Sequence, residues 1–145
     1  MKLLGISGSA RRASTNTALL EAMIVTAPRN IELTFSDPIS DLPIFSPDLE
    51  GANTPSIVLN FIEQVDLADG LIISSPEYVH AIPGGLKNAI DWLVSRHEII
   101  GKPVVLVHAS HRGKDMLRSL RLVLQTVTDG FNNELFLRFS LMSKT

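Results

Sequence analysis

The stretch GLIISSPEYVHAIPGGLKNAIDW spans residues 70–92 and joins three kinds of segment in a fixed order. Residues 70–75 begin with an apolar run typical of a buried strand, and residues 83–96 carry the apolar spacing of a helix. Between them lies a short polar loop that is bounded by Pro76 and Pro83. Strand, loop and helix in this order form the repeating unit of α/β proteins, whose ligands bind at the carboxyl ends of the strands.

Strand and helix patterns alternate along the rest of the chain. Strands are predicted at residues 2–7, 31–36, 70–75, 103–109 and 134–141, and helices at 15–27, 55–67, 83–96 and 114–127. This order predicts a parallel sheet with helices on both faces and right-handed crossovers. The favoured strand order is 2-1-3-4-5, which places the first and third strands at the topological switch point.

Local patterns refine this arrangement. Alternating apolar and polar residues place the strand at 31–36 near an edge, whereas the fully apolar strand at 103–109 should be buried on both faces. Thr54 and Pro55 predict an N-cap followed by proline in the first helical position. The residues spaced to form the buried face of the helix at 15–27 are Ala18, Leu19, Ala22 and Met23.

Composition limits the possible classes of protein. The chain has 145 residues, a formal net charge of −2 and no cysteine. We expect a single domain over residues 1–145, with no electrostatic footprint for nucleic acid or an anionic membrane. The absence of cysteine excludes disulfides and thiolate chemistry, and together with the lack of a signal peptide or membrane span it favours a soluble, cytoplasmic protein. No histidine pair has the spacing of a metal site.

The chain ends directly after the fifth predicted strand, where this arrangement normally adds a final helix. The final helix is therefore predicted to be missing, and part of one sheet face is expected to expose an apolar patch. Either a partner chain covers this face or the chain is shortened relative to a fuller gene product, and shortening is the favoured interpretation.

A second polar loop, GSARRASTN at residues 8–16, follows the first strand. Its hydroxyl, amide and guanidinium groups, with the first N–H groups of the following helix, are donors that bind phosphate. The loop lacks the Gly-Lys-Ser/Thr ending of a triphosphate-binding loop, so it suits a monophosphate that Arg11 contacts through charge-assisted bonds. The alternative is an ordinary N-capped helix with two solvated arginines.

The loop between Pro76 and Pro83 is stiffened at both ends and could present backbone N–H groups to the edge of a planar ring. A flavin needs such donors, because its reduction places a proton and negative charge on the ring. Glu77 and Tyr78 could equally be ordinary surface residues. Gly84 and Gly85 permit close approach of a ligand, or merely a tight helix start.

Three sequence motifs, two of them in these loops, resemble the NADPH-dependent FMN reductase family. They are Gly-Ser-x-Arg-x-x-Ser-x-Asn at 8–16, a proline-rich segment at 42–50, and Ser-Pro-Glu-Tyr followed by Ile-Pro-Gly-x-Leu-Lys-Asn-Ala-Ile-Asp-Trp at 75–92. The resemblance extends from residue 3 to about residue 124. It implies a flavodoxin-like fold, FMN as cofactor, NADPH or NADH as electron donor and a homodimer or homotetramer.

The resemblance also implies an activity: ping-pong hydride transfer from NAD(P)H through FMN to a flavin, quinone, azo compound or metal oxyanion. It implies cofactor-binding residues but no strictly catalytic residue. The FMN phosphate would be held by Ser9, Arg11, Ser14, Thr15 and Asn16. The flavin ring would be held by Pro76, Glu77, Tyr78 and Val79, largely through main-chain groups, and bordered by the loop at 109–113, which includes Ser110.

This chain departs from the family pattern at three positions in two of these loops. Many members have Asn where this chain has Val79, and His111 and Arg112 stand where the family usually carries a glycine pair. Two alternatives therefore stay open: a flavodoxin-type electron carrier, and a binding module that keeps the fold without the flavin. The near-neutral charge speaks against a carrier, since such carriers are usually strongly acidic.

The remaining candidates have mainly structural interpretations. His108 is expected to be a satisfied histidine in the core, whereas His80 and His111 lie on the candidate site loops. Lys87 and Asp91 are spaced to pair on one helix face. Trp92 suggests that this helix faces a partner in an oligomer, because an aromatic residue near the surface suits an interface.

Overall fold

The computed structural model describes residues 1–140 and contains a five-stranded parallel sheet in the order β2-β1-β3-β4-β5. The strands are β1 (Lys2–Ser7), β2 (Glu32–Phe35), β3 (Gly70–Ser74), β4 (Val104–His108) and β5 (Phe131–Arg138). The predicted strand order and the edge position of the second strand are confirmed. Leu141, at the end of the predicted fifth strand, lies outside the described residues.

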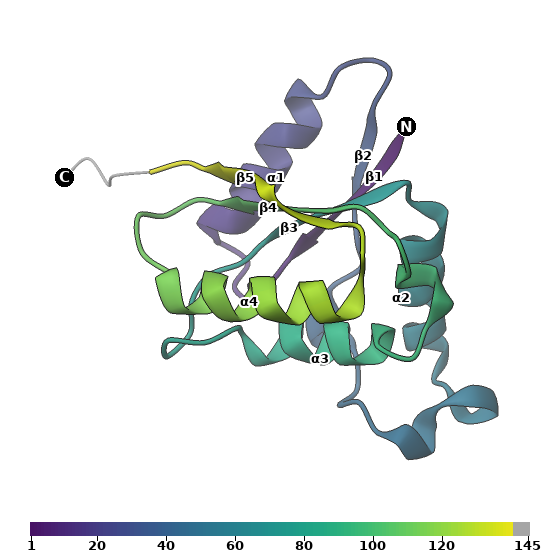
Figure 1. Ribbon diagram of the computed structural model, residues 1–145. Coiled ribbons are helices and arrows are strands. Elements are labelled where there is room, and N and C mark those ends of the chain that lie inside the picture. Colours follow the sequence, from purple (N-terminus) through teal and green to yellow (C-terminus); the bar gives the residue numbers. More distant parts are fainter. Residues whose placement is uncertain (141–145) are drawn as a thin grey trace.

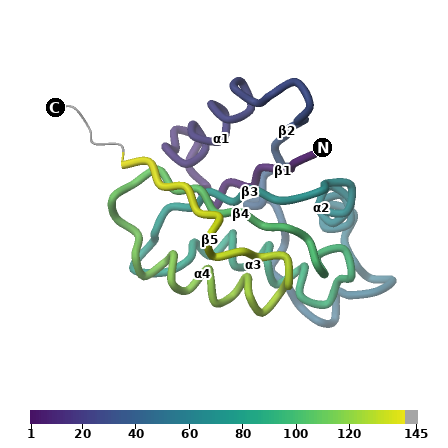
Figure 2. Tube along the Cα trace, turned by 45° about the horizontal axis from the view of Figure 1, so that its top comes forward, coloured from purple at the N-terminus to yellow at the C-terminus, as the bar shows by residue number. Residues whose placement is uncertain are grey.

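Helices cover the two faces of the sheet unequally (Figures 1 and 2). The helices are α1 (Thr15–Thr26), α2 (Ser56–Leu67), α3 (Gly84–Leu93) and α4 (Lys114–Val127). Within the described residues, α1 lies on one face, whereas α2, α3 and α4 lie on the other. Short 3-10 turns occupy the long connection between β2 and α2.

The alternation of side chains along the strands divides the core into two clusters. Ile73 in β3 joins the large cluster beneath α2, α3 and α4, whereas its neighbour Ile72 joins Leu20 of α1 on the opposite face. Both residues are buried because helices cover β3 on each side. Burial of these apolar side chains drives folding and fixes the register of the central strands.

Several local predictions need correction. The predicted buried face of α1 is half right: Leu19 and Met23 are partly buried against the core, but Ala18 and Ala22 are exposed, and Leu20 is the apolar residue that α1 buries fully. The reason is that α1 packs across β1, β2 and β3, which selects a different stripe of its surface. Pro55 itself is the N-cap of α2, so the helix begins one residue later than predicted, and α3 ends at Leu93.

The face of β5 on the α1 side is open in the described part of the chain. Leu135 and Leu137 are 55% and 51% exposed, and Phe139 just beyond the strand is also exposed. Phe136, between the two leucines, turns to the opposite face and packs against the larger core cluster. The expected apolar patch is therefore present on this strand.

Candidate functional site

The loops after β1 and β3 are joined directly at the carboxyl edge of the sheet. The backbone N–H of Gly8 donates to Ser74 O at 2.8 Å, and the Ser74 hydroxyl donates to Asn16 Oδ1 at 2.9 Å. Position 8 needs glycine, because a Cβ there would lie 2.8 Å from the Cβ of Ser75. Asn16 is buried, so its carboxamide oxygen serves to tie the start of α1 to β3.

A cavity of about 580 Å³ opens between the start of α1, the loop after β3 and the loop after β4. This volume lies in the range of small-molecule sites. The cavity brings together five of the predicted site residues: Thr15, Asn16, Pro76, Glu77 and Ser110. His108 and the loop at 109–113 complete its wall, as expected for the loop after the fourth strand.

Two other predicted residues, both in the loop after β1, do not line this cavity. Ser9 and Arg11 line a separate cavity of about 420 Å³, together with Asp37 and Asp41 from the segment after β2. Ser14, Tyr78 and Val79 line neither cavity. Ser9 and Tyr78 connect the loops after β1 and β3, because their hydroxyl oxygens lie 3.4 Å apart.

The loop after β3 forms a tight turn that the sequence did not reveal. Tyr78 and Ala81 exchange two backbone hydrogen bonds, at 3.1 and 3.0 Å. The two residues between them, Val79 and His80, have φ values of 51° and 60°. Positive φ at both central positions characterises type I′ turns, which favour Asn and Gly rather than a β-branched residue.

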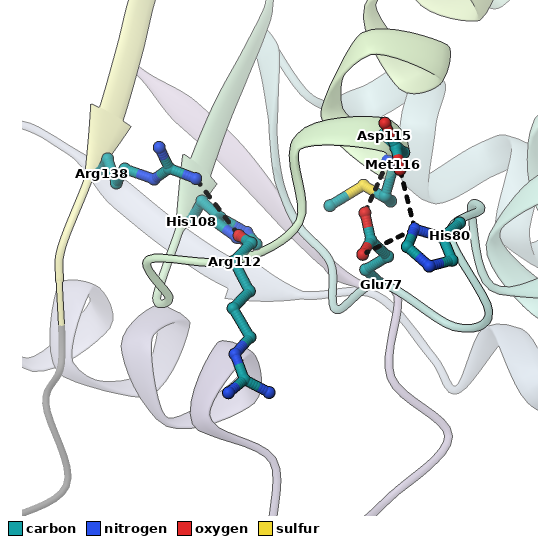
Figure 3. A network of polar contacts seen from close by, with 7 residues as sticks. All are labelled: Glu77, His80, His108, Arg112, Asp115, Met116 and Arg138. Carbon is teal, nitrogen blue, oxygen red and sulfur yellow. Dashed lines mark hydrogen bonds and ion pairs between the residues drawn. The ribbon is translucent and has the colours of Figure 1, made fainter.

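Glu77 connects this turn to the start of α4 (Figure 3). Its Oε2 accepts a hydrogen bond from the backbone N–H of Met116 at 2.9 Å, and His80 Nδ1 lies 2.8 Å from Asp115 Oδ2. The N-cap of α4 is Gly113, which has no side chain to satisfy the first N–H groups of the helix. The carboxylate of Glu77 therefore caps α4 from a distant part of the sequence and complements the helix dipole.

His108 lies between the loops after β3 and β4. The residue is only 1% exposed, and its Nδ1 and Nε2 lie 3.1 Å from Ser75 O and 2.6 Å from Arg112 O. The Arg138 guanidinium of β5 donates to Ser110 O at 3.0 Å and to Arg112 O at 3.2 Å (Figure 3). The expectation of a buried histidine with polar partners is confirmed, and those partners belong to the two loops that border the cavity.

Two predictions on α3 have opposite outcomes. Lys87 and Asp91 do pair, with Nζ 2.6 Å from Oδ1. The idea that Trp92 lies near the surface is wrong: its side chain is fully buried and donates through Nε1 to Pro43 O at 2.8 Å. A partner contact of α3 stays a prediction without that support. Asn88 adds bonds to Pro43 O and from Phe45 N, so α3 holds the proline-rich segment of residues 42–45 in place.

No group of three or more His, Asp or Glu side chains over residues 1–140 is arranged to hold a metal ion. In the same part of the chain, no helix is both long and apolar enough to cross a membrane.

Comparison with known proteins places this site in a family context. An NAD(P)H-dependent FMN reductase of Pseudomonas aeruginosa is 39% identical over 112 residues, which cover 76% of this chain and 60% of that protein. A quinone reductase of Escherichia coli K12 is 34% identical over 113 residues, with the same two shares. The chain thus matches about 60% of the length of these curated relatives.

The solved structures agree with the sequence matches. A flavoenzyme NAD(P)H:(acceptor) oxidoreductase from Paracoccus denitrificans superposes with a TM-score of 0.79 at 27% identity, covering 91% of this chain and 75% of that one. The family model described as NADPH-dependent FMN reductase matches residues 1–132, and the chain therefore belongs to that family.

Proposed function

We propose that this protein is an FMN-dependent NAD(P)H oxidoreductase, and that residues 1–145 form a single FMN-binding domain. The observation that carries the proposal is the cavity between the start of α1 and the loops after β3 and β4, in a chain of this family. Its place at the carboxyl edge of β1, β3 and β4 is where open α/β sheets bind ligands.

The donors around the cavity suit a phosphorylated, electron-rich ligand. Ser14 is the N-cap of α1, yet its side chain makes no cap hydrogen bond, so the first N–H groups of α1 are left for an anion. Thr15 adds a hydroxyl, and Arg112 adds a guanidinium to the opposite wall. The residues present therefore fit FMN.

In the proposed complex, Ser14, Thr15 and the start of α1 hold the phosphate, with Ser9 and Arg11 contributing from the preceding loop. The backbone of residues 76–79 and the loop containing Ser110 hold the flavin ring. Bound FMN supplies hydride chemistry between NAD(P)H and an acceptor. The protein's own part is to orient the ring and to place donors at its polar edge, so no strictly catalytic side chain is required.

The acceptor is proposed to be a small molecule such as a quinone, flavin, azo compound or metal oxyanion. Quinone reductases among the relatives support the first of these. We also propose a homodimer or homotetramer, and a cytoplasmic location that fits the absence of cysteine.

The test is flavin binding followed by anaerobic reduction. The purified protein with added FMN should show flavin absorbance after removal of free cofactor, and NADPH should bleach that absorbance. Binding without bleaching by NADPH or NADH would indicate an electron carrier instead. A failure to bind added FMN would contradict both flavin functions and favour a binding module without cofactor.

Arg11 is the most testable part of the phosphate assignment, because its side chain is exposed and carries little of the fold. Arg11→Ala should weaken FMN binding by about tenfold, through loss of a charge-assisted hydrogen bond. Arg12→Ala is the matched control, since Arg12 is equally exposed and lines the same cavity. Fluorescence titration gives both affinities, and equal effects of the two substitutions would show that Arg11 is no specific ligand.

A further inference from the structure

The two ring nitrogens of His108 both face backbone carbonyl oxygens. Nδ1 lies 3.1 Å from Ser75 O, and Nε2 lies 2.6 Å from Arg112 O. A carbonyl oxygen can only accept a hydrogen bond, and a neutral imidazole carries a single N–H. A neutral ring would therefore leave one nitrogen lone pair directed at a carbonyl oxygen, inside a site that is 1% exposed.

Only the doubly protonated ring satisfies both contacts. The short distance from Nε2 to Arg112 O is typical of a hydrogen bond to a charged donor. Turning the ring over would place carbon atoms where both nitrogens now lie and would abandon both bonds. The geometry therefore points to an imidazolium.

One charged group shares a contact of the ring directly (Figure 3). Arg138 from β5 shares Arg112 O with the ring, and its positive charge opposes a second cation there. Glu77 lines the same cavity as His108, but its carboxylate and that of Asp115 are engaged at the start of α4, with Met116 N and His80. The two carbonyl contacts are therefore what supports a second proton on the ring.

The two carbonyl groups belong to the two loops that border the cavity on either side. Ser75 directly precedes Pro76 in the loop after β3, and Arg112 lies in the loop after β4. Gly113 permits the close approach of the second loop, since its φ is +97° and a Cβ there would lie 2.8 Å from His108 Nε2. The imidazole ring thus sets the distance between the two loops.

We propose that His108 is a positioning residue whose doubly protonated ring clamps the loops after β3 and β4 together and adds a fixed positive charge to the cavity wall. The evidence for the clamp is the pair of contacts that the His108 ring makes with Ser75 O and Arg112 O. The effect of the charge on a bound flavin rests on the proposed function: reduction adds negative charge to the flavin ring, and a cation in the wall stabilises it.

The first test uses the unmodified, ligand-free protein. Nitrogen-15 NMR of the histidine side chains at neutral pH should show protons on both ring nitrogens of His108. An unprotonated nitrogen in that ring would overturn the charged clamp. This result does not depend on FMN binding, nor on whether any variant folds.

The second test compares His108→Gln with His97→Gln. Glutamine keeps donor groups but has no charge, and His97 is an exposed histidine whose ion pair is with its neighbour Glu98. His108→Gln should speed amide hydrogen exchange of residues 112–116 by about tenfold or more, because a charged hydrogen bond is lost. His97→Gln should leave that exchange unchanged, and equal protection in both variants would overturn the positioning role.

The third measurement connects the clamp to the cofactor. His108→Gln should bind FMN more weakly and shift the midpoint potential of the bound flavin to more negative values, whereas His97→Gln should shift neither. An unchanged potential would overturn the electrostatic part of the proposal. Failure of the unmodified protein to bind FMN would contradict the proposed function instead, and would leave the NMR and exchange results to decide the clamp.

Discussion

Val79 holds a backbone conformation that β-branched residues rarely adopt. Its φ is 51°, and its side chain is 95% exposed, so no packing of that side chain compensates for the strain. The left-handed region is unfavourable by roughly 1–2 kcal/mol for residues with a Cβ. Strain of this kind concentrates at ligand sites, which fits the position of the turn beside the cavity.

Replacing Val79 with a residue suited to the turn should therefore stabilise the protein. Val79→Asn is expected to raise the free energy of unfolding by about 1 kcal/mol, because Asn tolerates positive φ at low cost. Val94→Asn is the matched control: Val94 is also an exposed valine, but its φ of −58° is ordinary. Urea denaturation measures both, and a loss of stability in Val79→Asn would show that the turn is not strained.

Gly113 combines a left-handed backbone with a crowded site. Gly113→Ala should lower the free energy of unfolding by about 2 kcal/mol or more, since the new methyl group meets the His108 ring in addition to the unfavourable φ. Gly101→Ala separates the two causes: φ there is +68°, yet nothing lies within 4 Å of the added Cβ. Thermal or urea unfolding should give a smaller loss of stability for Gly101→Ala. Equal losses of stability would mean that the His108 ring moves aside at no cost.

At the scale of elements, α4 depends on a cap that comes from another part of the chain. Glu77→Ala should lower the free energy of unfolding by about 1 kcal/mol, because the start of α4 loses the acceptor of the Met116 N–H. Glu63→Ala, at an exposed position in α2, is the control and should change stability by less than about 0.5 kcal/mol. Urea titration of both variants without added ligand measures their free energies of unfolding. Similar losses of stability in the two variants would argue against the cap.

Elements were more predictable from the sequence than the contacts between them. Strands and helices follow from apolar periodicity, which is local, and the α4 boundaries match the prediction residue for residue. The buried face of α1 depends on which strands the helix crosses, and Trp92 is buried because a distant proline-rich segment covers it. Neither fact is encoded in local spacing.

The candidate site was partly predictable for the same reason. The loops after β1 and β3 meet because parallel strands end at one edge, and this follows from topology alone. The side-chain role of Glu77 was missed, since nothing in its own loop shows that Gly113 leaves α4 without a cap. The absence of a capping side chain at the helix start is the signal that could have suggested a distant partner.

Across the whole molecule, the open face of β5 should govern the behaviour of this chain in solution. Leu135→Gln combined with Leu137→Gln should reduce binding of a hydrophobic dye and reduce light scattering at high concentration, because both exposed leucines lie on one face. Leu122→Gln, an exposed leucine on α4, is the control and should have a smaller effect. Dye binding that persists in the double variant would show that the dye binds another exposed apolar surface of the chain.

The polar contacts of Glu77 and His108 also change how ligand affinity should be understood. Both side chains join the loops around the cavity through hydrogen bonds within the chain itself. The walls are thus preorganised, and little loop entropy remains to be lost on association. Affinity and folding stability are consequently linked in both directions: ligand should raise the melting temperature by mass action, and substitutions that loosen the walls should show first as faster ligand release.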